Sequence, residues 1–344
     1  MKAARLYGIK DIRIEDVPTP KPSSGEILLK VKAAAVCGTD VRMWGFGAKG
    51  VDAEHPLILG HEFSGVIEEL GSQVSGYEVG QSVAVAPNMG CGICDLCVSG
   101  NGQLCEDYKA FGVNIDGGFA EYVLIPEKAV RGGNIVPIDG ISFEAGALNE
   151  PLSCAFNGSS HCRIRPGNLV LVVGAGVIGI MHAFLAKMAG AGKVVLSDLE
   201  ESRLEKVKEL DPDFITVGAL DIEKVKELTL GHLFDVIITA CPSPAAQASS
   251  FSFAAVNGRI CFFGGLPKEK EEVALNTNII HYKQLLVTGT TRASHIQYRD
   301  TLRFIKEGLI PADKLITKKA PLEDINVLFS LAERAIGLKN VVEF

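Results

Sequence analysis

The 344-residue chain lacks several features that would place it in common functional classes. It has no excess of basic residues: the formal net charge is -7, so neither nucleic acid nor an anionic membrane surface is an expected partner. Its N-terminus has no apolar core of the kind found in signal peptides, so we expect a cytoplasmic location. It has no internal repeat and no low-complexity segment. Apolar residues make up 47%, which indicates a globular protein.

A membrane span is also not expected. The apolar run at residues 169–186 reaches the lower length limit for a membrane helix. However, Gly174, Gly176 and Gly179 interrupt it. A strand, a tight turn and a helix explain these glycines better than a membrane helix does.

The nine cysteines are unevenly placed, and Cys91, Cys94, Cys97 and Cys105 form a dense group. Without a secretory signal, such a group indicates metal binding rather than a disulfide framework. Four thiolates so close in sequence can surround one zinc ion as a tetrahedron with no open position, which is typical of a structural site. An iron–sulfur cluster, which also takes four cysteines, is the alternative. The remaining cysteines show no ligand spacing.

The pattern of apolar runs predicts an α/β protein of two domains. Residues 1–154 contain short β-type runs broken by Gly and Pro, which favours an irregular, barrel-like β-domain. These runs include Glu26–Val31, Gly65–Leu70, Ser82–Ala86 and Phe119–Ile125. Residues 293–344 hold two helical patterns and a strand-like Asn340–Phe344, and we expect this tail to return to the first domain.

Residues 155–292 instead alternate apolar strands with helix-length segments. This alternation predicts a doubly wound parallel sheet, because a parallel crossover needs a helix between strands. We expect strands at Leu169–Val173, Lys193–Ser197, Phe214–Val217, Phe234–Thr239, Arg259–Phe263 and Gln284–Thr288, and helices that include Val177–Ala189, Glu201–Glu209 and Ala245–Ala255.

A dinucleotide site is predicted where the first of these strands ends. The strand runs into Gly174-Ala-Gly176-Val-Ile-Gly179, and the next strand ends at Asp198, which is the context that this glycine motif requires. Gly174 permits the turn, Gly176 lets the backbone approach the pyrophosphate, and Gly179 lets the helix pack on the sheet. The alternative is a packing cluster of glycines without a ligand.

The residue type at position 198 bears on the choice of coenzyme. The Asp198 carboxylate would accept hydrogen bonds from the ribose hydroxyls and repel a 2′-phosphate, so NAD is favoured over NADP. Arg203 would either stack on the adenine or weaken that preference. Further expected coenzyme contacts are Ile178, Gly264, Gly265, Thr290 and Thr291.

Two short motifs near the N-terminus are the catalytic candidates, Cys37-Gly-Thr39-Asp and Gly60-His61-Glu62. Taken singly, such residues are more often packed in a core. Beside a nicotinamide site they gain meaning, because hydride transfer from an alcohol needs the hydroxyl proton removed and the alkoxide stabilised. A zinc ion with an open position does both.

These motifs, the four-cysteine group, Glu150-Pro-Leu-Ser, the glycine motif and Asp198 occur in one fixed order. In this the chain resembles, over essentially its whole length, the zinc-containing medium-chain dehydrogenase family and its sorbitol (polyol) dehydrogenase branch. The resemblance implies a chaperonin-10-like (GroES-like) catalytic domain and a Rossmann coenzyme domain. It also implies NAD and two zinc ions per chain, one catalytic and one structural.

The resemblance further implies roles for single residues. Cys37 and His61 become ligands of the catalytic zinc. Glu62 matches the third protein ligand of polyol dehydrogenases, and Glu150 matches a glutamate that contacts the metal's water or the substrate, so both carboxylates stay candidates for the metal. Thr39 matches the proton-relay hydroxyl, and Asp40 a residue that orients the histidine.

Other positions bear on the substrate. Arg292 matches an arginine near the substrate, whereas its neighbour Ala293 departs from the expected tyrosine. Arg42 stands where many relatives carry the histidine that ends the relay, so proton release is expected through water or the coenzyme ribose. Trp44 either walls the substrate pocket or packs in the core.

The predicted function is therefore zinc-dependent oxidation of a secondary hydroxyl of a small polyol, with hydride transfer to NAD. Oxidation of L-threonine and of a polyol phosphate, whose phosphate Arg42 or Arg292 would bind, are the alternatives within the enzyme class. A silent dinucleotide-binding scaffold is the non-enzymatic alternative. The family implies a homo-oligomer, a dimer or a tetramer.

Overall fold

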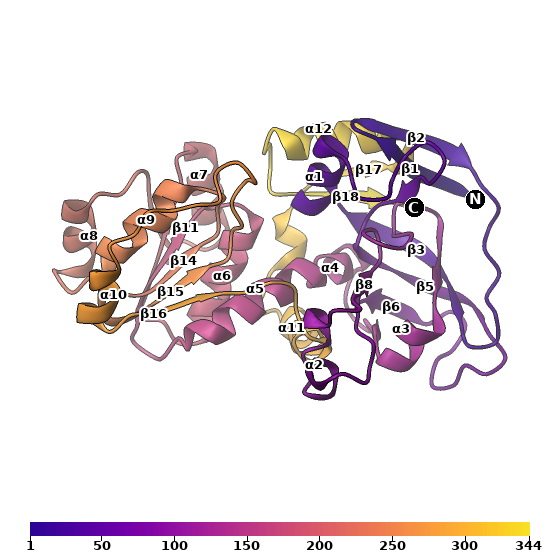
Figure 1. Ribbon diagram of the computed structural model, residues 1–344, viewed down its shortest axis with the longest axis horizontal. Coiled ribbons are helices and arrows are strands. Elements are labelled where there is room, and N and C mark those ends of the chain that lie inside the picture. The colour runs from indigo at the N-terminus through magenta and orange to yellow at the C-terminus, as the bar shows by residue number, and fades with distance from the viewer. The chain divides into compact units, whose positions relative to one another are not determined.

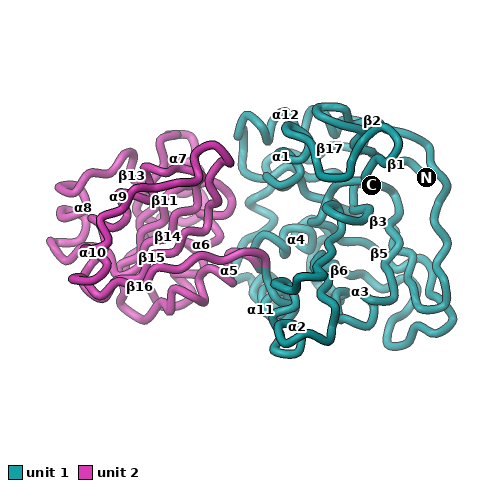
Figure 2. Tube along the Cα trace, in the orientation of Figure 1, with its two compact units in different colours: residues 1–153, 293–344 teal, residues 154–292 magenta.

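The computed structural model describes all of residues 1–344. The chain divides into two compact units, which Figure 2 shows in two colours. Unit 1 comprises residues 1–153 and 293–344, and unit 2 comprises residues 154–292. Unit 1 is thus built from two separate stretches of the chain. Helix α5 (Asn149–Cys162) begins in unit 1 and ends in unit 2.

Unit 1 is mainly β-structure. Its strands are β1 (Lys2–Gly8), β2 (Asp11–Asp16), β3 (Ile27–Ala35), β4 (Leu57–Ile58), β5 (Glu62–Leu70), β6 (Ser82–Val85), β7 (Asn88–Met89), β8 (Lys109–Ala110), β9 (Tyr122–Ile125), β10 (Ile135–Pro137), β17 (Ile316–Pro321) and β18 (Lys339–Glu343). Its helices are α1 (Gly38–Phe46), α2 (Asp95–Val98), α3 (Glu127–Gly132), α4 (Phe143–Ala147), α11 (His295–Lys306) and α12 (Ile325–Glu333), with 3-10 turns at Gly102–Leu104, Ala312–Leu315 and Leu322–Asp324.

Strand β3 lies inside the large sheet of unit 1, between β5 and β18. The large sheet has the order β10-β6-β5-β3-β18-β17, and β9 also pairs with β3. Ile27–Ala35 is almost entirely buried, because its run of aliphatic side chains lies between partners on both sides (Figure 1). The expected strand at Phe119–Ile125 begins only at Tyr122, because before it Ala120 forms just an isolated bridge with Ala3.

The sheet of unit 2 is parallel throughout, as predicted. Its strands β11 (Leu169–Val173), β12 (Lys193–Ser197), β13 (Ile215–Val217), β14 (Phe234–Thr239), β15 (Ala254–Phe262) and β16 (Leu286–Gly289) have the order β13-β12-β11-β14-β15-β16. The helices are α6 (Val177–Met188), α7 (Glu201–Leu210), α8 (Ile222–Thr229), α9 (Pro244–Phe253) and α10 (Thr277–Lys283). The order reverses between β11 and β14, and ligands bind beyond the carboxyl ends of strands at such a switch point.

Several boundaries in unit 2 differ from the prediction. The strand expected at Gln284–Thr288 is β16 (Leu286–Gly289), because the chain is still ending α10 at Gln284. The helix expected at Ala245–Ala255 ends at Phe253, because the chain enters β15 at Ala254. Ala254 pairs with Phe234, and the register then shifts before Arg259 pairs with Val236. Asn257 lies in this irregular stretch with a φ of 60°. Of the expected strand Arg259–Phe263, residues 259–262 form the regular second half of β15, and Phe263 lies just beyond its end.

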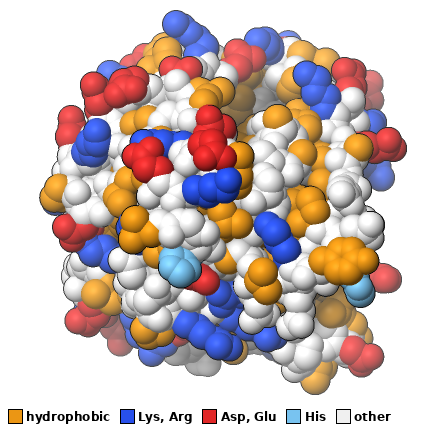
Figure 3. All heavy atoms as spheres, turned by 90° about the vertical axis from the view of Figure 1, so that its left-hand side faces the viewer, with side chains coloured by type: hydrophobic (Ala, Val, Ile, Leu, Met, Phe, Trp, Pro, Cys, Tyr) orange, Lys and Arg blue, Asp and Glu red, His pale blue; other side chains and the backbone are white.

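No helix combines the length and the apolar character that a membrane span requires. Figure 3 shows one face of the molecule, on which Lys and Arg side chains alternate with Asp and Glu side chains. On this face there is no broad basic patch of the kind that nucleic-acid binding requires.

Candidate active site and metal centres

The four predicted cysteines come together in one lobe of unit 1. The Sγ atoms of Cys91, Cys94, Cys97 and Cys105 all lie within 4.8 Å of one another. Cys91 Sγ is 3.9 Å from Cys97 Sγ, and Cys94 Sγ is 3.7 Å from Cys105 Sγ. A tetrahedron with zinc–sulfur bonds of about 2.3 Å has sulfur–sulfur edges of about 3.8 Å. The spacing fits a single zinc ion and is too wide for a disulfide.

The backbone of the lobe supports thiolates at these positions. The N–H of Cys94 donates to Cys91 Sγ at 3.3 Å, and the N–H of Cys91 donates to Cys105 Sγ at 3.3 Å. The backbone N–H groups of Ile93 and Cys94 lower the pKa of Cys91 to about 6. Gly90 is required here, because a Cβ at this residue would lie 2.5 Å from Cys97 Sγ. The lobe is thus shaped for anionic sulfur.

A second group of metal-ligating atoms forms from two distant segments of unit 1. Cys37 precedes α1, and His61 and Glu62 stand where β5 begins. One ligand atom of each residue lies within 4.8 Å of the other two. His61 and Glu62 are buried, whereas Cys37 is partly exposed. A thiolate, an imidazole and a carboxylate form a donor set that suits zinc.

Asp40 joins the two segments of this group. Its Oδ2 accepts a hydrogen bond from the N–H of Cys37 at 2.8 Å, and its Oδ1 accepts one from the N–H of Gly60 at 3.2 Å. The same Oδ1 lies 3.3 Å from His61 Nδ1. This is the orienting position expected for Asp40. With Nδ1 turned toward Asp40, Nε2 of His61 is left for a metal.

The electrostatics of the group favour a cation. Burial alone would lower the pKa of His61, but Asp40 and Cys37 raise this pKa well above its usual value. A buried imidazole that gains a proton so readily lies in a strongly negative local potential. A divalent ion would find the same potential at this place.

The structure places beside this group Lys339, which belongs to none of the motifs in the sequence. Its Nζ lies 2.7 Å from Oε1 and 2.5 Å from Oε2 of Glu62, and both residues are buried. Burial would lower the pKa of Lys339, but Glu62 and Cys37 raise it above its usual value, while burial also raises the pKa of Glu62. Lys339 begins β18, whose sequence Lys-Asn-Val-Val-Glu gives no signal of this contact.

The other catalytic candidates have different positions. Glu150 is buried at the start of α5, but it is not in the group that converges with Cys37 and His61. Thr39 lies on α1, where its Oγ1 accepts a hydrogen bond from Arg42 Nη2 at 3.5 Å. Trp44 is buried with its ring edge-on to Phe329, 5.6 Å between centroids. Its position favours core packing over a pocket wall.

In the glycine motif of unit 2, the fold requires glycine at Gly174 and Gly179 but not at Gly176. Gly174 has a φ of 105°, and a Cβ at Gly179 would lie 1.8 Å from the carbonyl oxygen of Gly174. Both glycines are therefore needed for the strand–turn–helix unit itself. A Cβ at Gly176 would meet nothing within 4 Å, and its φ of -72° suits any residue. The fold itself therefore does not require glycine at 176, and close approach of a phosphate is the reason that the sequence predicts.

Asp198 lies just beyond β12, next to this turn. Its Oδ2 accepts a hydrogen bond from the N–H of Ala175 at 2.7 Å and lies 3.3 Å from Arg203 Nη1. Its Oδ1 accepts a bond from the N–H of Glu200 at 3.0 Å. The carboxylate is fixed at the carboxyl end of its strand. Arg203 pairs with this carboxylate, a contact that the sequence analysis did not anticipate.

The remaining coenzyme candidates follow the strand ends of unit 2. Gly264 comes after β15, where a Cβ would lie 2.5 Å from the carbonyl oxygen of Cys241, and Gly265 is next to it. Thr290, Thr291 and Arg292 follow β16. The carbonyl of Arg292 accepts a hydrogen bond from Asn157 Nδ2 at 2.9 Å. Ile178 lies in the first turn of α6.

A parallel sheet with a phosphate-binding turn and two zinc-type donor sets define a metal- and dinucleotide-dependent oxidoreductase. The family described as "Alcohol dehydrogenase GroES-like domain" matches residues 23–133, and the one described as "Zinc-binding dehydrogenase" matches residues 177–307. The chain therefore belongs to the zinc-containing medium-chain dehydrogenases, in their sorbitol dehydrogenase-like branch. It is an enzyme of alcohol oxidation that uses zinc and a nicotinamide dinucleotide.

Individual proteins show the extent of this similarity. Sorbitol dehydrogenase of Bacillus subtilis is 32% identical over 99% of this chain and 95% of its own length. L-threonine 3-dehydrogenase of Rhizobium etli is 34% identical over 90% of this chain and 89% of its own length. An alcohol dehydrogenase (rspB) from Escherichia coli CFT073, solved with NADH, has a TM-score of 0.89 at 29% identity and covers 100% of this chain and 99% of its own.

Proposed function

We propose that this protein oxidises a secondary hydroxyl of a small polyol and transfers the hydride to NAD. The observation that carries the proposal is the convergence of Cys37, His61 and Glu62 within 4.8 Å in a chain 32% identical to a sorbitol dehydrogenase along 99% of its length. An L-threonine 3-dehydrogenase is 34% identical to this chain, which keeps the amino alcohol as the competing substrate.

In this proposal Cys37, His61 and a carboxylate hold the catalytic zinc, and Glu62 and Glu150 are the two carboxylates available. The four cysteines from Cys91 to Cys105 hold the structural zinc. Bound zinc supplies a Lewis acid that makes the substrate hydroxyl more acidic. Carboxylate oxygen is a harder donor than a second thiolate and leaves the ion more electrophilic.

The chain's own residues perform the remaining work. Asp40 holds His61 in one orientation through Oδ1, 3.3 Å from Nδ1. Thr39 carries the hydroxyl that accepts the substrate proton and passes it outward. Arg42, at 3.5 Å from that hydroxyl, is a permanent cation and cannot act as the terminal base, so the proton leaves to water or the coenzyme ribose.

The coenzyme is assigned to the carboxyl ends of the strands in unit 2. The N-terminus of α6 and the Gly176 backbone face the pyrophosphate. Asp198 binds the adenosine ribose and disfavours a 2′-phosphate, and Arg203, paired with Asp198 at 3.3 Å, reduces the repulsion that a 2′-phosphate would meet. We therefore propose NAD as the preferred coenzyme, with measurable use of NADP.

An anionic polyol is the second candidate substrate, because Arg42 places a guanidinium beside Thr39. A polyol phosphate or a sugar acid would gain from this charge. Replacing Arg42 by His would then raise KM for the anionic substrate while leaving KM for sorbitol unchanged.

The test is NADH formation on sorbitol, xylitol, galactitol 1-phosphate, L-galactonate, L-threonine and 2,3-butanediol. Preference for one polyol supports the proposal, and the Cys37→Ser variant should be inactive on it. Turnover of L-threonine with silence on every polyol would move the assignment to the amino alcohol. Silence on all of these compounds by protein that holds two zinc ions would contradict both substrates.

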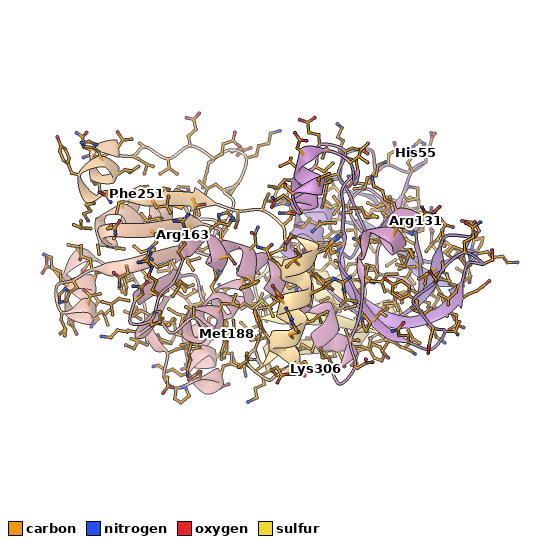
Figure 4. All side chains as sticks on the ribbon, turned by 90° about the horizontal axis from the view of Figure 1, so that it is seen from below. His55, Arg131, Arg163, Met188, Phe251 and Lys306 are labelled. Carbon is orange, nitrogen blue, oxygen red and sulfur yellow. The ribbon has the colours of Figure 1, made fainter.

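We also propose that the protein is a homo-oligomer, a dimer or tetramer. Strand β16 is the last strand of its sheet, and its outer edge has no strand partner in the chain. Such an edge invites pairing with a second copy. A pocket of about 340 Å³ lined by His161, Arg163 and Leu286–Thr288 opens beside it (Figure 4 labels Arg163). Light scattering should give a multiple of the chain mass, and Leu286→Lys should reduce it.

The cytoplasmic location stays a prediction.

A further inference from the structure

We propose that Lys339 is a positioning residue of the catalytic metal centre, which holds the Glu62 carboxylate beside Cys37 and His61 and takes up part of its negative charge. The inference rests on the proposed function, because it concerns how that metal is held. Lys339 does not belong to any of the motifs on which the sequence analysis depended.

The contact leaves one oxygen of Glu62 available. Lys339 Nζ donates a hydrogen bond to Glu62 Oε1 at 2.7 Å, whereas Oε2, although 2.5 Å from Nζ, is buried and accepts no hydrogen bond. The side chain of Lys339 is 5% exposed, and that of Glu62 is 0% exposed. A buried ion pair of this kind contributes little stability over apolar packing, because both charges lose their water. The stability of the fold therefore does not explain why Lys339 and Glu62 are buried together, whereas a role at the metal centre does.

The strand register explains how the lysine reaches this place. Ala35 of β3 pairs with Glu62 of β5 on one side and with Val341 of β18 on the other, so these three residues point to the same face. Lys339 is two residues before Val341 and shares its face. Ala35, between the two strands, has only a methyl side chain, which leaves room for the lysine to extend toward Glu62.

The negative charges nearby explain why a cation is needed. Asp40, Glu62 and Glu150 are buried in this part of unit 1, and the thiolate form of Cys37 joins them when a metal binds. Zinc alone would not balance these charges. An ammonium group on Glu62 reduces the charge that this carboxylate donates to the ion. The ion then stays electrophilic and keeps a position for the substrate.

The geometry also restricts how Glu62 can coordinate. Because Lys339 engages Oε1, Oε2 is the oxygen that Glu62 can offer to an ion at Cys37 and His61. Without the lysine, Glu62 would turn freely or bind through both oxygens. The coordination number at the metal would then change, and with it the place for the substrate hydroxyl.

The test replaces Lys339 by Met, which keeps the length of the side chain and removes its charge, and by Arg, which keeps the charge. Both variants and the wild type are loaded with Co²⁺ at the catalytic site, and the visible spectrum is recorded as a measure of coordination. Release of Co²⁺ to a chelator is followed at the same wavelength. Activity is measured separately as kcat and as KM for NAD.

K339M is expected to have a changed cobalt spectrum and to release the ion about tenfold faster, the usual cost of losing a residue that orients a ligand. Its kcat should fall about tenfold or more, with KM for NAD unchanged, because unit 2 supplies the coenzyme contacts. K339R should restore the wild-type spectrum. A wild-type spectrum and release rate in K339M would overturn the proposal and leave Lys339 a purely structural partner.

A double variant keeps the test decisive even if K339M does not fold. E62Q and E62Q/K339M leave no unpaired buried carboxylate, and the double variant buries neither charge. If Lys339 acts through Glu62, the two variants have the same spectrum and release rate. A further change on adding K339M to E62Q would contradict the proposal.

Failure of the proposed function would look different. Wild-type protein that binds one metal ion per chain, or a cobalt spectrum that survives Cys37→Ser, would remove the catalytic metal itself. Neither result depends on Lys339. A normal wild-type metal count with an unaltered K339M spectrum would instead reject only the role of Lys339.

Discussion

The two metal centres of unit 1 are built in opposite ways. The four-cysteine lobe takes all its donors from the short segment Cys91–Cys105, and three of these cysteines are partly exposed. The centre at Cys37 takes its donors from distant segments, joins thiolate, imidazole and carboxylate, and buries His61, Glu62 and Lys339. Four identical thiolates from one loop complete the coordination shell of an ion. Three different donors from separate elements each have their own hydrogen-bonding neighbour, and these neighbours can alter the donor strength and orientation of each ligand separately.

Cys37→Ser gives the largest expected effect and would separate the two centres. Loss of the catalytic ion removes several kcal/mol of transition-state stabilisation, which corresponds to about a thousandfold in kcat. Zinc content should fall from two ions per chain to one, measured by atomic absorption. Cys241→Ser is the control and should keep both ions. Near-normal turnover in C37S would contradict the catalytic assignment.

Asp40→Asn is expected to act only on the buried centre. The amide cannot hold His61 and the backbone of Cys37 as the carboxylate does, so metal affinity and activity should fall about tenfold to a hundredfold. Titration with a zinc indicator measures the affinity. The exposed Asp52→Asn is the matched control. Equal loss from the four-cysteine lobe would show that the two centres are not independent.

Cys97→Ser is expected to act on the other centre. A structural zinc ion contributes folding free energy, so its loss should lower Tm by roughly 5–10 °C in a thermal scan. The rate at low temperature should stay close to that of the wild type. A loss of activity as large as that of C37S would mean that the lobe serves catalysis directly.

Gly90→Ala should give the smallest effect. The new Cβ would lie 2.5 Å from Cys97 Sγ, and overpacking of this kind costs about 1–3 kcal/mol. The expected result is a small fall in Tm and faster zinc release from the lobe. Gly102→Ala is the control, because its Cβ would lie at an ordinary 3.7 Å from the same sulfur. Equal behaviour of the two variants would count against the close fit of the lobe around its ion.

Local patterns in the sequence were enough for the parts of the fold that depend on neighbours in the chain. Strands β11, β12 and β14 have the predicted bounds, because apolar runs between turn residues mark buried parallel strands. The four-cysteine group likewise depends on local spacing. Helices α8 and α10 lie between strands of unit 2, as the alternation predicts, but no bounds were predicted for them.

The sequence alone did not predict which side chains of distant segments would be in contact. The choice between Glu62 and Glu150 depends on where β5 and α5 bring their side chains, and the structure groups Glu62 with Cys37 and His61. Lys339 is separated from Glu62 by most of the chain, and no spacing rule connects them. Trp44 had two interpretations because its burial depends on Phe329, in a helix near the C-terminus.

The discontinuity of unit 1 has a consequence for synthesis on the ribosome. Unit 2 is complete once residue 292 has emerged, whereas β3 acquires its neighbour β18 only when residues 339–343 follow. Domains generally fold as units as the chain emerges, so the coenzyme unit can fold first. Until then Ala33–Ala35 of β3 lack their partner on the β18 side, although β5 already pairs with β3. Glu62 therefore meets Lys339 only after the whole of unit 2 has emerged, and the candidate metal centre at Cys37 is completed after the coenzyme unit.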